Sequence, residues 1–459
     1  MSYPLSDAHR STPSVWDTLI VGAGASGTMA GHCLQNQGRH VTLWEKARGV
    51  GGRMSTRRAT LPTLSPQEAE TMPSTCYYDH GAQFIRFASL EASSHAHPPA
   101  MATEPQWHTL VQSWCQNASL LTPWFAGDPA YPEATQITPE TQASHTYPDA
   151  TLAWAGTHGM VTLPKHLSKT LPVATSHLVT GLTYHPENTV WEVTAEVKDP
   201  QTGATHTQQA HSQHVVLTAP LPQTLALLKT IDLTQWEPAQ KVVLEDATFA
   251  MSSVMYHPCY ALMLTVPVQA LAPPLKQVLP WPGVMPYEVL QKHAGLETPL
   301  GWVGVSQAKQ LMPTCVDETG QAWVSLTVQS APEWTWQHVE EAPEVVEAAL
   351  YHAMQDVVLQ PWFVARCLET LQHPSQALPL TLLRHKALHR WRYSAVNPYT
   401  LSPALKELTQ QKGYIEVLPK LWVAGDGLIG GRVESALRSG YEVAQAILQT
   451  ANLSEPVPS

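Results

Sequence analysis

The sequence predicts an α/β fold of the mixed α+β type, and three observations lead to this prediction. Residues 17–45 have the pattern of a strand, a glycine-rich turn, a helix and a second strand. Residues 191–197 alternate apolar and polar side chains, which is typical of a half-buried antiparallel strand. Residues 421–424 form a last apolar run before a long helical pattern. A chain of 459 residues is too long for one ordinary core, so we expect two domains.

The first strand–helix–strand unit is the best defined part of the pattern. Residues 17–21 are a short apolar run that ends in glycine, and Val41 and Leu43 alternate with polar neighbours in the second strand. Gly38 suits the end of the helix between them. Four apolar residues share one face of that helix: Met29, Ala30, Cys33 and Leu34.

Later elements follow from shorter patterns. We expect helices over 159–171 and 341–358 and strands over 215–217, 260–266 and 322–328. Residues 60–78 are rich in Pro, Ser, Thr and Glu, which predicts a surface insertion. Residues 92–150 are rich in proline and are predicted to be mostly loop, a candidate lid, with a short helical piece near 110–114.

The charge and the composition exclude several classes of protein. At a formal charge of −11, nucleic acid and anionic membranes are not expected partners, since both bind basic surfaces. The chain has no run of about 18 apolar residues and no apolar segment over 1–15, so we expect neither a membrane span nor a secretory signal. The six cysteines form no C-x-x-C pair and the 22 histidines no H-E-x-x-H motif. We therefore expect no metal site, no disulfide framework and a cytoplasmic location.

The glycine-rich turn predicts a dinucleotide site. Gly22 permits a tight turn out of the strand, Gly24 lets backbone approach a pyrophosphate, and Gly27 lets the helix pack closely on the strand. The helix that follows directs its free N–H groups and positive dipole end at the phosphates. We therefore assign Ala25 and Ser26, in the first turn of that helix, to the same site.

A carboxylate and a second glycine run narrow the choice of dinucleotide. Glu45 ends the second strand, where it would accept hydrogen bonds from a ribose and disfavour the 2′-phosphate of NADP; Lys46 follows it. Gly51 and Gly52 permit another close backbone approach, and Arg53 offers a fork for phosphate. A G-G-R-M run ending at Met54 is the second contact of the glutathione-reductase type of FAD-binding domain.

The C-terminal segment completes the predicted cofactor site. Asp426 follows the last buried strand after Gly425, where flavoproteins of this type bind a ribityl hydroxyl. Arg432 and Val433 begin the last helix, whose N-terminus would face the pyrimidine edge of a flavin. No cysteine lies near this segment, so we expect FAD to be bound without a covalent link.

These motifs, in this order, resemble the bacterial renalase-like FAD enzymes, a branch of the flavin amine oxidase group. The resemblance spans nearly the whole chain after residue 15 and is carried by residues 51–57, 79–84, 159–160, 163–167, 258–264, 331–335, 389–393, 425–426 and 430–434. This chain departs from the family in its long segments 60–78 and 92–150. It also departs at Gly427, where the family has a bulkier residue beside the flavin, and after the Ser306–Lys309 turn, which lacks a following Pro-Gly.

The resemblance implies a fold like that of p-hydroxybenzoate hydroxylase, with a Rossmann-like FAD-binding domain and an inserted mixed-sheet substrate domain. The FAD domain would comprise 15–90, 155–235 and 415–452, and the substrate domain 91–154 and 236–414. Residues 1–14 and 453–459 would be flexible tails. The resemblance also places Gln83 and Phe84 beside the flavin, and Val179 is assigned to the cofactor site.

The resemblance further implies oxidation of aberrant dihydro-NAD(P) isomers. A hydride would pass to flavin N5, and dioxygen would reoxidise the flavin with release of hydrogen peroxide. Such a transfer needs no strong base, because the product is already an aromatic cation. His80 and Gln83 would orient the substrate, and Arg390 and Arg392, on one face of a strand, would contact its phosphates.

Other interpretations stay open at this level. Lys309 could be a site lysine of the kind amine oxidases use, although a surface turn is favoured; Trp334 and Trp336 are expected in a core or interface. A flavin amine oxidase acting on a primary amine or polyamine is the alternative enzyme, but no aromatic cage is evident and Gly427 weakens one. A non-catalytic protein that binds FAD as a structural group is a second alternative.

Overall fold

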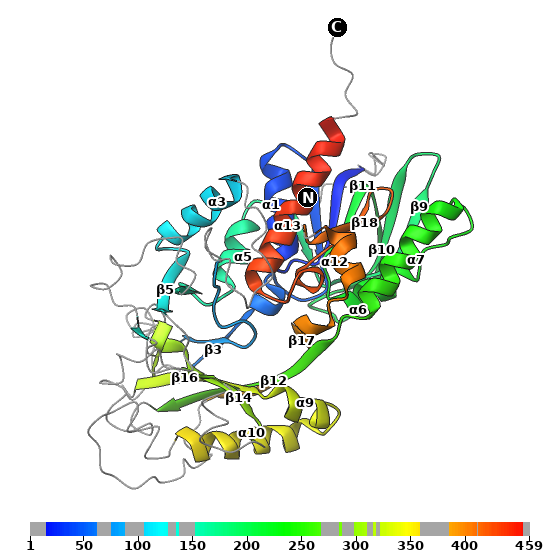
Figure 1. Ribbon diagram of the computed structural model, residues 1–459. Coiled ribbons are helices and arrows are strands. Elements are labelled where there is room, and N and C mark those ends of the chain that lie inside the picture. Colours follow the sequence, from blue (N-terminus) through cyan, green and yellow to red (C-terminus); the bar gives the residue numbers. More distant parts are fainter. Residues whose placement is uncertain are drawn as a thin grey trace, which may run out of the picture.

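The computed structural model describes residues 15–61, 75–87, 105–126, 135–136, 152–267, 284–286, 298–309, 315–317, 322–358, 385–410 and 412–452. Two large sheets organise these residues, and each has helices packed against it (Figure 1). Most of the two segments predicted as surface insertion and loop, 60–78 and 92–150, and both predicted tails lie outside the described residues.

The first sheet has eight strands and carries the glycine-rich turn. Its main path is β18 (Tyr414–Leu418), β19 (Leu421–Ala424), β11 (Thr205–Leu217), β1 (Trp16–Val21), β2 (Val41–Glu45) and β8 (Val173–Thr175). The neighbours of β1 and β2 are parallel to them, and β19 is parallel to β11. On one side β11 also pairs antiparallel with β10 (Val190–Lys198), which pairs with β9 (His177–His185). The carboxyl ends of β1, β2 and β19 therefore meet at one edge, where α/β sheets bind ligands.

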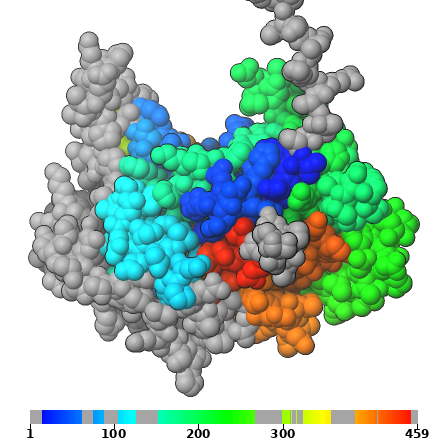
Figure 2. Space-filling model, turned by 90° about the horizontal axis from the view of Figure 1, so that it is seen from above, coloured from blue at the N-terminus to red at the C-terminus, as the bar shows by residue number. Residues whose placement is uncertain are grey.

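Helices cover both faces of this sheet. On one face, α1 (Ala25–Asn36) lies against α13 (Val433–Asn452), so the first and last helices of the fold are neighbours (Figures 1 and 2). A buried cluster joins them to the strands: Ile20, Ala30, Leu34, Leu43, Val216, Val443 and Ile447. The other face is covered by α6 (Leu221–Leu228), α7 (Pro238–Ser252) and α12 (Pro403–Thr409) through a second cluster around Trp191, Leu217 and Val423.

The second sheet has six strands and two helices below it in Figure 1. Its path is β13 (Val284–Pro286), β14 (Leu300–Val305), β16 (Ala322–Ser330), β12 (Tyr256–Pro267) and β17 (His385–Val396), with β15 (Cys315–Val316) beside β16. The helices are α9 (Pro332–His338) and α10 (Pro343–Val358), and α10 buries Val346, Leu350 and Met354 against the strands. β12 runs antiparallel to both of its neighbours.

Smaller elements connect the two sheets. They are the hairpin β3 (Thr56–Thr60) and β4 (Thr75–Asp79), the sheet of β5 (Leu121–Ala126), β6 (Thr135–Gln136) and β7 (Leu152–Gly156), and the helices α3 (Pro105–Gln116) and α5 (Thr162–Leu167). The helix expected over 159–171 is thus limited to six residues, because Gly159 has a φ of +89° and the turn at 157–161 keeps its own hydrogen bonds. The short helix expected near 110–114 is longer than predicted, because Trp107, Val111 and Trp114 bury one face.

The observed architecture is the predicted fold class: a Rossmann-like FAD-binding unit joined to a second sheet. The domain limits given above stay a prediction. Within the residues that the structure describes, no helix combines the length and the apolar character needed to cross a membrane.

Candidate active site

The turn between β1 and α1 is built as its glycines predict. Gly22 has a φ of +105°, and a Cβ on Gly27 would lie 2.0 Å from the carbonyl oxygen of Gly22, so no side chain fits at position 27. The N-cap residue of α1 is Gly24, and no side-chain cap is formed there among the residues that the structure describes. The buried Oγ of Ser26, in the first turn of this helix, has no hydrogen-bond partner among the described residues. The helix end thus offers unpaired donors to a ligand.

The end of β2 places a carboxylate beside this turn. Glu45 is buried, and its two oxygens accept hydrogen bonds from the backbone N–H groups of Ala23, at 2.7 Å, and Ala47, at 2.8 Å. Two fixed donors hold the carboxylate in one orientation while leaving it further lone pairs. This geometry fits the ribose contact predicted for Glu45.

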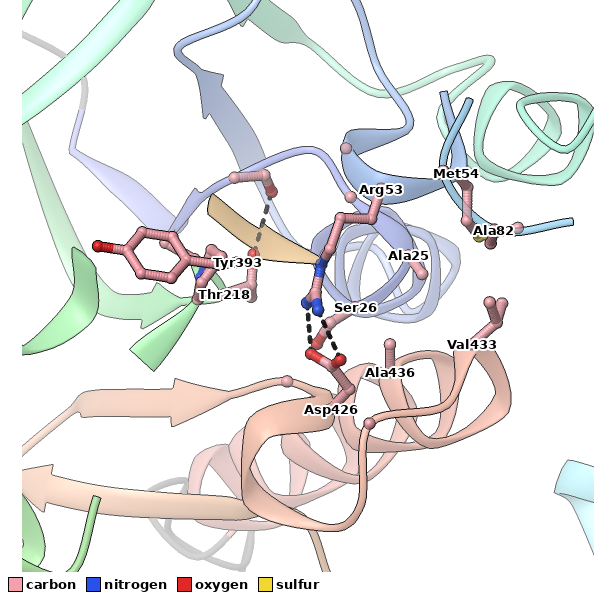
Figure 3. Close-up of a pocket in the computed structure, with 18 of the residues that line it drawn as sticks. Ala25, Ser26, Arg53, Met54, Ala82, Thr218, Tyr393, Asp426, Val433 and Ala436 are labelled. Carbon is pink, nitrogen blue, oxygen red and sulfur yellow. Dashed lines mark hydrogen bonds and ion pairs between the residues drawn. The ribbon is translucent and has the colours of Figure 1, made fainter. Parts of the chain in front are cut away.

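The second glycine run and the C-terminal segment meet across the site. Arg53 lies in the short helix η1 (Gly52–Met54) and Asp426 begins η7 (Asp426–Leu428). The guanidinium donates from Nη1 to Oδ2 at 2.8 Å and from Nη2 to Oδ1 at 2.5 Å. Figure 3 shows the two side chains pointing toward one another beside Ser26. Burial alone would lower the pKa of Arg53, but the charge and hydrogen bonds of Asp426 outweigh it and raise that pKa.

A single cavity of about 2130 Å³ runs past all of these groups. Pockets for one drug-sized ligand measure about 300–1,000 Å³, so this cavity has room for a dinucleotide and a substrate together. The predicted cofactor residues that line it are Gly22, Gly24, Ala25, Ser26, Glu45, Lys46, Gly51, Gly52, Arg53, Met54, Gln83, Phe84, Val179, Gly425, Asp426, Arg432 and Val433. Gly27 does not line the cavity, because it packs against Gly22 behind the turn. The residues predicted for one cofactor site therefore lie around one cavity, apart from Gly27.

The other end of the cavity, which we call the substrate end, is lined by aromatic and histidine side chains. They are His80, Phe84, Trp302, His389 and Trp391. His80 stacks on Trp391, with ring centroids 5.2 Å apart, and meets His389 edge-on at 4.9 Å. Trp391 Nε1 donates to the carbonyl oxygen of His80 at 2.7 Å. Burial, with a smaller effect of His389, lowers the pKa of His80 to about 4, so its imidazole is neutral near neutral pH.

Arg390 and Arg392 on β17 contact protein groups at residues 339 and 340, whereas the sequence predicted that they contact substrate phosphates. As expected, they share one face of the strand and Trp391 the other. Arg392 forms a forked pair with Glu340, at 2.6 and 3.2 Å, and Arg390 donates to the carbonyl oxygen of Val339 at 2.7 Å. Both arginines line the cavity and are exposed. A substrate phosphate would therefore have to displace Glu340 from Arg392, and their substrate role stays a prediction.

The structure corrects the expectation that Lys309 lies on a surface turn. Lys309, in η4 (Ser306–Lys309), is buried, and its Nζ lies 2.6 Å from Asp79 Oδ2 and 2.8 Å from the carbonyl oxygen of Gln83. The ammonium also lies 4.9 Å from the ring centroid of Trp124. The polar sequence around position 309 gives no sign of this burial, because the partners come from β4 and β5. Lys309 does not line the cavity but holds the segment that supplies His80, Gln83 and Phe84.

Asp79 connects that segment to the cofactor side of the site. Its Oδ1 accepts hydrogen bonds from Thr56 Oγ1 at 2.6 Å and from the backbone N–H of Met160 at 2.8 Å. Asp79 and Lys309 thus tie three parts of the chain together: the strand after the Gly51–Arg53 run, the turn before α5, and the second sheet. From the sequence, a site lysine was only the less favoured interpretation of Lys309, and Asp79 was not assigned to the site.

Two further residues bear on the expectations from the sequence, Gly427 after the last buried strand and Trp336 on α9. A Cβ at Gly427 would meet Tyr256 Oη at 2.4 Å and Leu221 Cγ at 2.8 Å, so this residue packs away from the cavity and leaves its aromatic lining unaffected. Trp336, expected in a core or an interface, is 48% exposed in the described fold and so lies outside its core. The aromatic lining that the sequence did not reveal comes instead from three separate segments, with Trp302 on β14, Phe84 after β4, and Trp391 on β17.

Comparison with known proteins gives two family matches and a similar solved structure. Residues 20–95 match the NAD(P)-binding Rossmann-like domain, and residues 85–448 match the model described as flavin containing amine oxidoreductase. Cyclohexylamine oxidase from Brevibacterium oxydans IH-35A is similar at 12% identity and a TM-score of 0.48, covering 96% of this chain and 100% of that one.

Proposed function

Since the chain belongs to the flavin containing amine oxidoreductase family, we propose that it is an FAD-dependent oxidase of a small primary amine. Family membership makes the chain an oxidoreductase that uses a flavin. The choice of substrate rests on one observation, the aromatic lining of the substrate end. The rings of Phe84, Trp302 and Trp391 suit an amine with an apolar or cyclic body.

The residues at the cofactor end fit FAD. The buried Ser26 Oγ without a partner and the uncapped end of α1 suit a pyrophosphate, which would supply the missing acceptors. A Cβ on Gly52 would lie 3.2 Å from Gly24 Cα, so side chains here would narrow the space that the two glycine runs leave open. Glu45 would hold a ribose, and Arg53 with Asp426 would contact the phosphate and ribityl region. When bound, FAD would accept a hydride from the substrate carbon and pass two electrons to dioxygen, giving hydrogen peroxide.

The charges at the substrate end favour an uncharged amine. The aromatic and histidine residues of the substrate end include no carboxylate, and Arg86 and the two β17 arginines line the same cavity; the carboxylates described in its lining, Glu45, Asp426 and Glu434, belong to the segments that carry the cofactor motifs. His80 is neutral and buried, so it can accept a hydrogen bond from a substrate amine. A polyamine with several ammonium groups would find no opposite charge there. The chemistry of the lining therefore supports a monoamine, bound after it has lost its proton.

Oxidation of dihydro-NAD(P) isomers is the second candidate, and one observation favours it. His80 and Trp391 present stacked rings that suit a flat dihydropyridine, and Arg390 and Arg392 lie near enough to line the same cavity. Against it, both arginines contact Glu340. A Glu340→Gln variant should bind such dinucleotides more tightly if these arginines hold their phosphates, and should leave amine turnover unchanged.

Anaerobic reduction of the FAD-loaded protein tests the proposal. The bound flavin should bleach rapidly with cyclic and aromatic monoamines, more slowly with polyamines, and slowly with borohydride-treated NAD(P)+ mixtures. Readmitted air should then restore the yellow colour and yield about one peroxide per flavin. Bleaching by the dihydropyridine mixture alone would establish the second candidate, and bleaching by neither would remove both.

A further inference from the structure

Three side chains on the outer strands of the first sheet form a cluster away from the cavity. Glu192 on β10 lies directly opposite His211 on β11 and Thr183 on β9. His185 is two residues beyond Thr183 on β9, so it points to the same face of the sheet. His185, Glu192 and His211, which we call the sheet triad, are thus gathered from three neighbouring strands and are each half-buried.

The distances within the sheet triad are close to those of a metal site. Glu192 Oε2 lies 3.7 Å from His185 Nε2 and 3.5 Å from His211 Nε2. All three ligand atoms lie within 4.8 Å of one another. Tetrahedral Zn²⁺ with bonds of about 2.0–2.1 Å keeps its ligand atoms roughly 3.4 Å apart. Two edges of the triad are therefore already near the required length, and a small rotation of one imidazole would close the third.

A second layer of polar groups orients these ligands. Glu187 Oε1 lies 3.4 Å from His185 Nδ1, on the side of the ring opposite the triad. Gln209 Nε2 donates to Glu192 Oε1 at 3.0 Å, which leaves Oε2 directed at the histidines. His185 Nε2 is buried and makes no hydrogen bond within the described part of the chain. Metal-binding histidines are typically held by a carboxylate on their other nitrogen, as His185 is here.

We propose that the sheet triad binds a divalent transition-metal ion of the Zn²⁺ class. Two imidazoles and one carboxylate are a ligand set that zinc accepts, with water in the fourth position. Sequence analysis expected no metal site because it found no local spacing of ligands. The triad instead comes from residues 185, 192 and 211 and is assembled only by strand pairing. Such a site cannot be found from a short motif.

The position of the triad indicates a structural role for the metal. Thr180 is the last residue of β9 that lines the cavity, and His185 follows five residues later, about 16 Å along the strand. The metal would therefore not touch the flavin or the substrate. It would join β9, β10 and β11, and so stiffen the strands whose first part carries Val179 beside the cofactor site.

Calorimetric titration of the FAD-loaded, EDTA-treated and desalted protein with Zn²⁺ alone tests this proposal. We expect one tight equivalent and a higher melting temperature with zinc, while the rate of anaerobic flavin reduction stays unchanged. Glu192→Gln and His211→Asn should each weaken this binding at least about tenfold, and Glu187→Gln, which removes the outer carboxylate, by about tenfold or somewhat more.

The exposed His206 provides the matched control. It lies on β11 with His211 but outside the triad, so His206→Asn should leave zinc affinity and the thermal shift unchanged. Flavin absorbance reports whether each variant is folded. Zinc binding that is equal in wild type, Glu192→Gln and His211→Asn, or the absence of a tight equivalent in the wild type, would overturn the proposal and leave only the His–Glu ion pairs.

Discussion

Arg53 and Asp426 are 373 residues apart in sequence, yet their side chains form a two-point ion pair inside the cavity. The pair joins the end of the N-terminal glycine run to the second residue after the last buried strand. Arg53 also donates to the carbonyl oxygen of Ser394, on β17 of the second sheet, at 3.3 Å. One guanidinium therefore holds three distant segments in register around the proposed flavin position.

Replacing Asp426 with Ala should destabilise the protein and weaken FAD binding together. The change leaves the Arg53 guanidinium without its carboxylate, and because this arginine keeps 25% of its side chain exposed, we expect a loss of about 2 kcal/mol rather than the larger cost of a fully buried charge. Urea unfolding of the FAD-free protein measures the first effect and flavin titration the second. Arg53→Ala combined with Asp426→Ala should cost less than the sum of the two single changes; additive losses would show that the pair does not act as a unit.

The ion pair between Lys309 and Asp79 should contribute more, because it is almost completely buried. Lys309→Met keeps a long apolar side chain but leaves the Asp79 carboxylate unpaired, which should cost about 3–5 kcal/mol in unfolding free energy. Adding Asp79→Asn removes the stranded charge and keeps an acceptor for Thr56 and Met160. The double variant should then be more stable than Lys309→Met by at least about 1 kcal/mol. A double variant no more stable than the single one would mean that Lys309 acts by packing alone.

A substitution at Ser26 should weaken FAD binding without lowering the stability of the FAD-free protein. The buried hydroxyl of Ser26 has no partner in the described protein, so Ser26→Ala should leave the stability of the FAD-free protein unchanged or slightly higher. FAD should bind roughly fivefold more weakly, the equivalent of about 1 kcal/mol, because a phosphate oxygen loses one donor. Titration of the apoprotein with FAD, alongside thermal unfolding without it, distinguishes these effects. A loss of stability without FAD would show that the hydroxyl has a partner within the protein.

The buried imidazole of His80 should make the fold sensitive to mild acid. The pKa of His80 is lowered from 6.5 to about 4, chiefly by burial, so between these pH values the unfolded chain binds a proton that the folded chain does not. The unfolding free energy should therefore fall as the pH drops from about 6.5 toward 4, and His80→Phe should reduce this dependence. His214, whose pKa burial also lowers to about 4, is the comparison for a site far from the cavity. If the pH dependence of His80→Phe matches that of the wild type, His80 is not the titrating group.

The cofactor end could be predicted from the sequence because its groups follow local rules. The turn at Gly22, the end of β2 at Glu45 and the end of β19 at Asp426 each occupy a fixed place relative to a strand end. Parallel strands bring these ends to one edge. Prediction thus needed only the order of the elements and their residue types. The same geometry places Arg53 beside Asp426, for which the sequence predicted only a contact with the ribityl chain.

The substrate end could not be predicted, since it depends on how the second sheet packs against the first. Lys309 is buried by β4 and β5, and Trp302 reaches the cavity from β14. Neither position differs in sequence from an ordinary turn or half-buried strand. Gly427 was expected beside the flavin, where it would weaken an aromatic cage, but a side chain at this position would point at Tyr256 and Leu221. The surroundings of these residues depend on contacts between segments that are distant in the sequence, so a local sequence pattern does not predict them.

Trp302 provides the sharpest test of the proposed amine site. Its ring lies 6.0 Å from that of Phe84, and both line the substrate end. Trp302→Leu keeps an apolar side chain but removes the flat ring, so kcat/KM for cyclic and aromatic amines should fall by roughly three- to tenfold. FAD affinity should not change, because Trp302 lies away from the glycine runs. Trp336→Leu, at an exposed tryptophan on α9, is the matched control and should leave both quantities unchanged. Equal turnover in the two variants would show that the aromatic lining does not bind the amine. It would then favour the second candidate, oxidation of dihydro-NAD(P) isomers.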